Sequence, residues 1–166
     1  MSKRIGLLSD THSYLDPDVF KYFEECDEIW HAGDIGSPEV IEQLEAFKET
    51  RIVYGNIDDK TVQLMSSRDL HFEIEGVKVW ITHIGGYPGR YSRGIPALLD
   101  EYKPDLFICG HSHILRVMPD KKRKILHMNP GACGRYGFHQ IRTLLRFTID
   151  KGNITEVQVI ELGTRS

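Results

Sequence analysis

The stretch LFICGHSHIL, residues 106–115, begins as an apolar run and then places His111 and His113 just after Gly110. A short apolar run with β-branched residues is typical of a buried strand. We expect this strand over 105–109, so both imidazoles follow its carboxyl end. Two polar rings at the end of a core strand indicate that the strand leads into a binding site.

Four earlier apolar runs have the same form and predict strands over 4–9, 28–32, 51–54 and 77–82. DPDVFKYFEEC (16–26) and SPEVIEQLEAFKE (37–49) predict helices, because each opens with an Asp or Ser cap candidate and a proline. Alternating strands and helices predict parallel pairing. After residue 113, ILRVMP, KILHMNP, QIRTLLRFTI and ITEVQVIEL predict successive antiparallel strands. A second sheet packed on the first accounts for this β-rich end.

Length and composition predict a single domain over residues 1–166, since the chain has 166 residues and is 40% hydrophobic. The net charge of -3 gives no reason to expect nucleic acid or an anionic membrane as a partner. The basic run DKKRK (120–124) is expected to be a hairpin tip. The apolar run in MSKRIGLLSD is too short for a signal peptide, and the three cysteines form no CxxC pair. We therefore expect a soluble, cytoplasmic protein.

Side chains of metal-ligand type follow each of the five predicted early strands. Because carboxyl ends of parallel strands share one edge of a sheet, these side chains are expected to converge. In extended backbone, residues i and i+2 point to the same side, which aligns Asp10 with His12 and His111 with His113. Glycines 33, 55 and 110 each precede a candidate, where a turning backbone must come close to whatever that side chain holds. The candidates are Asp10, His12, Asp34, Asn56, His83, His111 and His113.

The chemistry of this set predicts a metal site. Four imidazoles, two carboxylates and one amide suit manganese, iron or zinc better than magnesium or calcium, which prefer oxygen ligands. Taken singly, each of these side chains would more often be structural. As an ordered set at strand ends, they predict metal binding.

The motif order DxH, GD, GN, a single H and GHxH resembles that of the calcineurin-like metallophosphoesterase superfamily. NPGA (129–132) resembles the NPGS of its small bacterial and archaeal phosphodiesterase branch. The resemblance implies an α/β fold, a four-layer α/β/β/α sandwich of two packed mixed sheets. It also implies two divalent ions, with manganese expected and zinc, iron or nickel as alternatives. One ion would be held by Asp10, His12, Asp34 and His113, and the other by Asp34, Asn56, His83 and His111.

The implied function is hydrolysis of phosphate esters, most often small phosphodiesters, by a hydroxide that the two ions share and that attacks phosphorus in line. Asn56 and Asp58 are the candidates for catalytic or orienting roles; Asp58 either orients a neighbouring group or caps the helix that follows. Many members have a histidine after the GN asparagine that protonates the leaving group. Here GNID places Ile57 at that position, so the proton must come from water or another residue.

Other polar residues have two readings. Arg90 and Arg93, in GGYPGRYSRG (85–94), and Arg135 are either substrate-binding residues or ordinary surface arginines. His31 is expected to be a satisfied core histidine or to support the ligands from within its strand, rather than to be a ligand, and it is the next candidate for the leaving-group proton. The remaining histidines, His71, His127 and His139, are expected to be structural or exposed.

A second function from another class is a non-catalytic metal-binding scaffold for protein interactions. The retromer subunit, which the resemblance places in the same superfamily, works in this way and lacks one motif histidine. All seven positions keep ligand chemistry in this chain, which favours an enzyme. The resemblance also allows a homo-oligomer.

Overall fold

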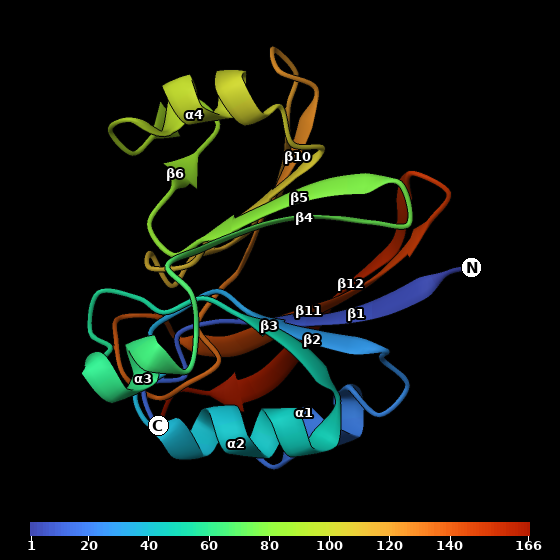
Figure 1. Cartoon of the computed structure of the whole chain (residues 1–166). Coiled ribbons are helices and arrows are strands. Elements are labelled where there is room, and N and C mark those ends of the chain that lie inside the picture. Colours follow the sequence, from blue (N-terminus) through green and yellow to red (C-terminus); the bar gives the residue numbers. More distant parts are fainter.

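The computed structural model describes residues 1–166 and shows two five-stranded sheets packed face to face (Figure 1). The first sheet consists, in spatial order, of β12 (Asn153–Thr164), β11 (Ile141–Asp150), β1 (Lys3–Leu8), β2 (Glu28–His31) and β3 (Glu49–Ile52). The second consists of β4 (Asp69–Ile74), β5 (Val77–Thr82), β8 (Leu106–Ile108), β10 (Ile125–Pro130) and β9 (Leu115–Asp120). Both are mixed, because β1, β2 and β3 are parallel, as are β5, β8 and β10, while the other strands pair antiparallel.

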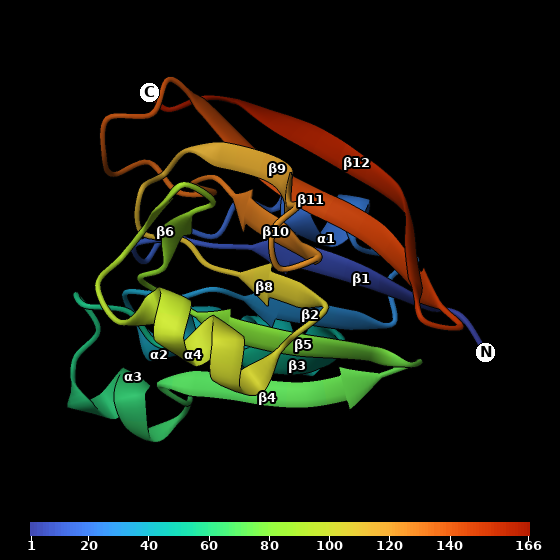
Figure 2. The same cartoon turned by 90° about the horizontal axis from the view of Figure 1, so that it is seen from above.

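Helices cover the outer faces of both sheets. The elements outside the sheets are α1 (Asp18–Tyr22), α2 (Pro38–Phe47), α3 (Lys60–Leu64), α4 (Ile95–Tyr102) and a small hairpin of β6 (Gly86–Tyr87) and β7 (Arg90–Tyr91). In Figure 1, α1 and α2 lie against the first sheet and α4 lies against the second. Figure 2 shows the same α4 from above, across the strands that it covers. The predicted four-layer α/β/β/α class is confirmed, and none of the helices has the length and apolar content needed to span a membrane.

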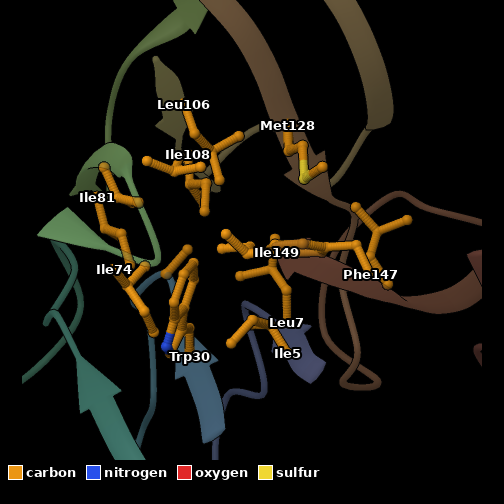
Figure 3. Packing of buried hydrophobic residues seen from close by; sticks show 14 of the residues in the cluster. Ile5, Leu7, Trp30, Ile74, Ile81, Leu106, Ile108, Met128, Phe147 and Ile149 are labelled. Carbon is orange, nitrogen blue, oxygen red and sulfur yellow. The ribbon is translucent and has the colours of Figure 1, made fainter. Parts of the chain in front are cut away.

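A buried apolar layer fills the space between the two sheets (Figure 3). Alternate residues of a strand face opposite sides, so β1 directs Ile5 and Leu7 into this layer and Leu8 toward α1 and α2. Each fully buried aliphatic side chain of this kind contributes roughly 1.5–3 kcal/mol. Trp30 joins from β2, and its Nε1 donates to Glu28 Oε1 at 3.0 Å, so its polar atom is satisfied. The layer fixes both sheets, and with them the strand ends that form the site.

The five strands expected from the early part of the chain are all present, and the predicted hairpin tip at 120–124 is the β9–β10 turn. The helix expected over 16–26 is confined to α1, and the one expected over 37–49 is α2, with Ser37 as N-cap residue and Pro38 in its first turn. The prediction of successive antiparallel strands is wrong at one junction. β10 pairs with β8 and β9, whereas β11 pairs with β1 and β12 in the other sheet. Residues 131–140 therefore cross between the sheets.

His127 on β10 predicts a pH dependence of stability. Its Nδ1 donates to Phe107 O at 3.2 Å, its Nε2 has no partner, and burial lowers its pKa to about 4. Above about pH 6.5 both folded and unfolded chains hold a neutral ring, whereas between about 6.5 and 4 only the unfolded chain takes up the proton. Stability attributable to this ring should therefore fall as pH decreases through that window.

The comparison needs His127→Phe, which keeps a ring but cannot titrate. From about pH 6.5 to 5, the unmodified protein should lose about 1.5 kcal/mol more of its free energy of unfolding than the variant does. Urea unfolding of metal-free protein at both pH values measures this difference. Equal losses in the two proteins would show that His127 titrates normally in the folded chain.

Candidate metal centre

The candidate ligands lie in loops that follow β1, β2, β3, β5 and β8. These loops come from both sheets, whose corresponding strand ends lie at the left of Figure 1, away from the N-terminus. The prediction that the ligands converge at the edge of one open sheet is wrong, because β5 and β8 belong to the second sheet. The two sets of loops meet where His111 N donates to Asp10 Oδ2 at 3.1 Å. Packing of one sheet on the other therefore assembles the site.

Six of the seven candidates form two compact groups. In each group the ligand atoms lie within 4.8 Å of one another. Asp34 Oδ2 lies 3.5 Å from His12 Nε2 and 3.2 Å from His83 Nε2, so this carboxylate stands between the groups. The first group is Asp10, His12 and His113, and the second is Asp34, His83 and His111.

Buried atoms without hydrogen-bond partners face this site. They are Asp10 Oδ1, His12 Nε2 and His83 Nε2. A buried polar atom that lacks a partner costs about 1–3 kcal/mol, and more when it is charged. His113 Nε2 lies 3.2 Å from Asp10 Oδ1, so lone pairs of a carboxylate and an imidazole point into the same space. Divalent cations would satisfy all of these atoms, and the donor set therefore fits metal ions.

Left-handed backbone is concentrated at the same residues. Asp10, His12, Asp34, His111 and His113 have φ between 45° and 71°. Such conformations are costly for non-glycine residues and cluster at functional sites. The backbone at these residues is therefore not extended, and the predicted strand-like alignment of Asp10 with His12 and of His111 with His113 is wrong. Turning loops, rather than strand pleats, direct these side chains.

Asn56, the seventh candidate, lies beside the second group. Its Oδ1 is 3.0 Å from His111 Nδ1, and its side chain is exposed. The preceding Gly55 passes so close to Asp34 that a Cβ would collide with the carboxylate. A Cβ on Gly33 would likewise collide with the His83 ring, and one on Gly110 with the side chains of Ser9 and Asp10, so the backbone at all three glycines passes against other candidate ligands.

Asp58 holds the loops around Asp34 in place. Its carboxylate accepts hydrogen bonds from the backbone N–H groups of Ile35, Gly36 and Gly55, at 2.8–3.0 Å. The capping alternative for this residue is wrong, because Asp59 caps α3 by accepting from Val62 N at 3.1 Å. Asp58 touches no ligand atom directly, so its role is to position the Asp34 and Asn56 loops.

The charges at the centre favour a bound cation. Burial alone would raise the pKa of Asp34, but the His83 side chain and the N–H of Ile57 outweigh it and lower that pKa. Burial alone would lower the pKa of His83, but the carboxylates of Asp34 and Asp10 outweigh this effect and raise that pKa. His83 Nδ1 donates to Ala32 O at 2.7 Å, which leaves Nε2 as the atom that faces the site. Asp34 is thus an ionised carboxylate beside an oriented imidazole.

His31 supports the centre from beneath, as expected. It is fully buried, its Nδ1 accepts from Gly33 N at 3.0 Å, and its Nε2 lies 3.0 Å from Thr11 Oγ1. Because Nδ1 accepts, Nε2 carries the proton and Thr11 accepts it, while the Thr11 hydroxyl donates to Ile35 O at 2.8 Å. Burial lowers the pKa of His31 to about 4. With both nitrogens occupied, this ring cannot reach a leaving group.

The three arginines have different positions. Arg135 follows Gly134, whose N donates to Asp10 O at 3.1 Å, and its guanidinium stacks on Tyr14 at 4.1 Å. Arg90 and Arg93 lie exposed in or just after the β6–β7 hairpin, and no hydrogen bond or ion pair joins either of them to a candidate ligand. Arg135 therefore lies in a loop whose backbone is tied to Asp10, but its guanidinium is on Tyr14, and no hydrogen bond or ion pair joins any of the three arginines to a candidate ligand.

Several neighbours of the centre could not be found from local sequence patterns. His139 packs its ring on His113 at 5.2 Å, and Tyr136 packs on His12 at 4.9 Å. Arg68 lines a pocket together with Asn56 and His83. The one available signal was NPGA, since Asn129 Nδ2 donates to Gly110 O at 3.0 Å and so ties the loop after β10 to the loop that carries His111 and His113.

The fold and the paired ligand groups define a metal-binding α/β/β/α protein of the phosphoesterase type. Residues 4–152 match the calcineurin-like phosphoesterase superfamily domain, and the chain belongs to this family. Membership makes metal-dependent hydrolysis of phosphate esters the general activity, with divalent metal ions as cofactors.

Relatives agree with this assignment. A protein of Methanothermobacter thermautotrophicus named probable metallophosphoesterase is 33% identical over 135 residues, which cover 77% of this chain and 76% of that protein. A Streptococcus pneumoniae protein described as a predicted phosphoesterase has a TM-score of 0.71 and 23% identity, covering 99% of this chain and 91% of the other. Vps29 of Entamoeba histolytica complexed with zinc has a TM-score of 0.73 and 16% identity, covering 98% of this chain and 99% of the other. The two structures show likeness of fold.

Proposed function

We propose that this protein is a two-metal phosphodiesterase. The observation that carries the proposal is the position of Asp34 Oδ2, 3.5 Å from His12 Nε2 and 3.2 Å from His83 Nε2, between two groups of ligand atoms. A carboxylate in that position suits a bridge between two ions. Asp10, His12 and His113 would hold one ion; His83, His111 and Asn56 would hold the other.

Two divalent ions held there would supply a hydroxide nucleophile for in-line attack on phosphorus and would offset the charge of the phosphoryl oxygens. Two dications add about four positive charges against the carboxylates of Asp10 and Asp34. A site in a chain of net charge -3 can therefore still attract a phosphate ester. Asp58 and His31 would keep the ligand loops in place during this step.

A diester is the proposed substrate because the centre is open. Asn56 and His111 are exposed, so a phosphate that carries ester groups on two sides can approach the ligands. The NPGA motif, which resembles that of the small phosphodiesterase branch, supports the same choice. Manganese is the proposed ion, with zinc, iron and nickel as alternatives, because imidazole and carboxylate ligands together suit this group of metals.

Two measurements test the proposal. Elemental analysis after manganese loading should find two ions per chain, and bis(p-nitrophenyl) phosphate should be hydrolysed faster than p-nitrophenyl phosphate. Faster turnover of the monoester would contradict the diester preference. Two bound ions with no turnover of either ester would favour the scaffold function.

Likeness of fold to Vps29 is the observation that favours the scaffold as a second candidate. A scaffold needs no complete set of ligand atoms, whereas six of the seven candidates here form two groups and Asn56 lies against His111. The complete set therefore supports the enzyme.

His111→Ala and His113→Ala should each deplete a different ion, because the two rings belong to different groups. Anomalous diffraction from manganese-loaded crystals separates the two positions, which total metal content cannot do. The matched control is His71→Ala, since His71 stacks on Trp80 outside both groups and its loss should leave both ions in place. Depletion of the same ion by both variants would contradict the division of ligands.

A further inference from the structure

Large apolar side chains are exposed directly beside the candidate ligands. Ile57, Ile84 and Ile114 each follow a candidate ligand in the chain, and their exposed fractions are 45%, 44% and 53%. A single exposed apolar residue needs no explanation, but a group of them around a polar centre marks a binding surface.

Tyr136 extends this surface along the first ligand group, and Phe138 stands exposed in the same loop. Tyr136 is 69% exposed and its ring packs on the His12 ring, with centroids 4.9 Å apart and planes at 33°. Phe138, two residues further on, is fully exposed. Neither ring belongs to a hydrophobic cluster, so the fold does not need them for its own core.

The loop that carries both rings is held firmly against the ligands. At one end Gly134 N donates to Asp10 O at 3.1 Å, and at the other His139 donates from Nε2 to Gly134 O at 2.8 Å. The His139 ring also packs on His113, with centroids 5.2 Å apart. Gly137 passes so close to His113 that a Cβ would collide with its ring. The two aromatic side chains are thus presented by a fixed backbone.

We propose that Ile57, Ile84, Ile114, Tyr136 and Phe138 form an apolar rim that selects phosphate esters whose non-leaving group is aromatic, and that Tyr136 and Phe138 supply the contact with its ring. This inference rests on the proposed function, because the metal centre has to hold the phosphoryl group. Sugar or polyol esters would leave these side chains in water and would expose their hydroxyl groups to apolar surface. A flat ring would cover the exposed faces and gain stacking with the aromatic pair.

The test uses two esters with the same charge and the same leaving group, phenyl p-nitrophenyl phosphate and methyl p-nitrophenyl phosphate. The unmodified protein should show a kcat/KM about tenfold higher for the phenyl ester. In the double variant Tyr136→Ala/Phe138→Ala this ratio should fall to within about twofold of one, while two metal ions remain bound. Tyr136→Phe should retain the ratio, because the ring and not the hydroxyl makes the contact.

Val159→Ala is the matched control, since Val159 is 49% exposed on β12, outside the rim, and its loss should leave the ratio unchanged. Binding of phenylphosphonate and methylphosphonate to manganese-loaded protein, measured by calorimetry, gives a second readout that needs no turnover. The phenyl compound should bind about tenfold more tightly to the unmodified protein and lose this advantage in the double variant.

The two proposals can fail separately. Without turnover of either ester, a phenylphosphonate preference that the double variant loses would leave the rim established and overturn the catalytic function. The other outcome is that both esters are hydrolysed but the phenyl-to-methyl ratio of kcat/KM, or of binding affinity, is the same in the unmodified protein and the double variant. That result would overturn the rim and leave the catalytic function standing.

Discussion

Asp34→Asn should lower turnover of bis(p-nitrophenyl) phosphate by a factor on the order of 1,000 and reduce metal occupancy at both positions. Asp34 is the one carboxylate with an oxygen within 3.5 Å of an imidazole from each group, His12 and His83. An amide has nearly the same shape, but it lacks the negative charge that a carboxylate offers to two cations. Loss of this single charge should therefore lower the affinity for both ions, whereas loss of a histidine should affect only the ion held by its own group.

Asp59→Asn provides the matched control, because it removes the same charge from a neighbouring loop. Asp59 is exposed and accepts from Val62 N as the cap of α3, without contact to either ligand group. That variant should bind two ions and keep turnover within about twofold, at a cost of about 1 kcal/mol or less in stability. Full activity and two bound ions in Asp34→Asn would remove Asp34 from the centre.

Local patterns predicted the parallel strands and the residues that follow them. Runs such as VWIT and LFIC have a composition that suits burial on both faces, and β5 and β8 are indeed central strands of their sheet. Glycine is also required by steric size before Asn56, because the passage of Gly55 against Asp34 leaves no room for a side chain. Both features depend on neighbours in the sequence or on steric size.

Features that depend on distant partners could not be predicted in the same way. β11 pairs with β1 across more than a hundred residues, and nothing in its own pattern separates this pairing from one with β10. β4 was not predicted: it pairs with β5 through a tight turn at Glu75 and Gly76, both with positive φ, and Glu-Gly is not one of the usual hairpin dipeptides. The left-handed backbone at Asp10 and His111 arises from loops that the opposite sheet holds in place.

The choice between Asp58 and Asp59 illustrates the same limit. Each stands near the start of α3 and each has the side chain of a good helix cap. Only the positions of Ile35 and Gly36, from a loop that is distant in sequence, show that Asp58 is turned toward the centre. Adjacent residues of one type thus differ in role because of contacts made after folding.

The rate should depend steeply on the leaving group, because Ile57 occupies the position that would otherwise supply a proton. Ile57 is 45% exposed, and only its backbone N–H interacts with the centre, by donating to Asp34 Oδ1 at 3.1 Å. Without a placed acid, negative charge builds up on the departing oxygen. In a series of methyl phosphodiesters, the rate of hydrolysis should fall as the leaving group changes from p-nitrophenyl to simple alkyl. This fall should be greater by a factor of about 100 to 10,000 than in an enzyme with such an acid.

Ile57→His should flatten this dependence and help poor leaving groups most, while its metal content stays at two ions per chain. Ile57→Gln is the matched control, since it adds a polar side chain that cannot donate a full proton, and it should keep the steep slope. The slope must be measured where chemistry limits the rate. A shallow slope in the unmodified protein would mean that another side chain donates the proton. His31 cannot be that donor because it is fully buried with both nitrogens occupied, so Tyr136→Phe, at an exposed ring beside His12, becomes the decisive variant.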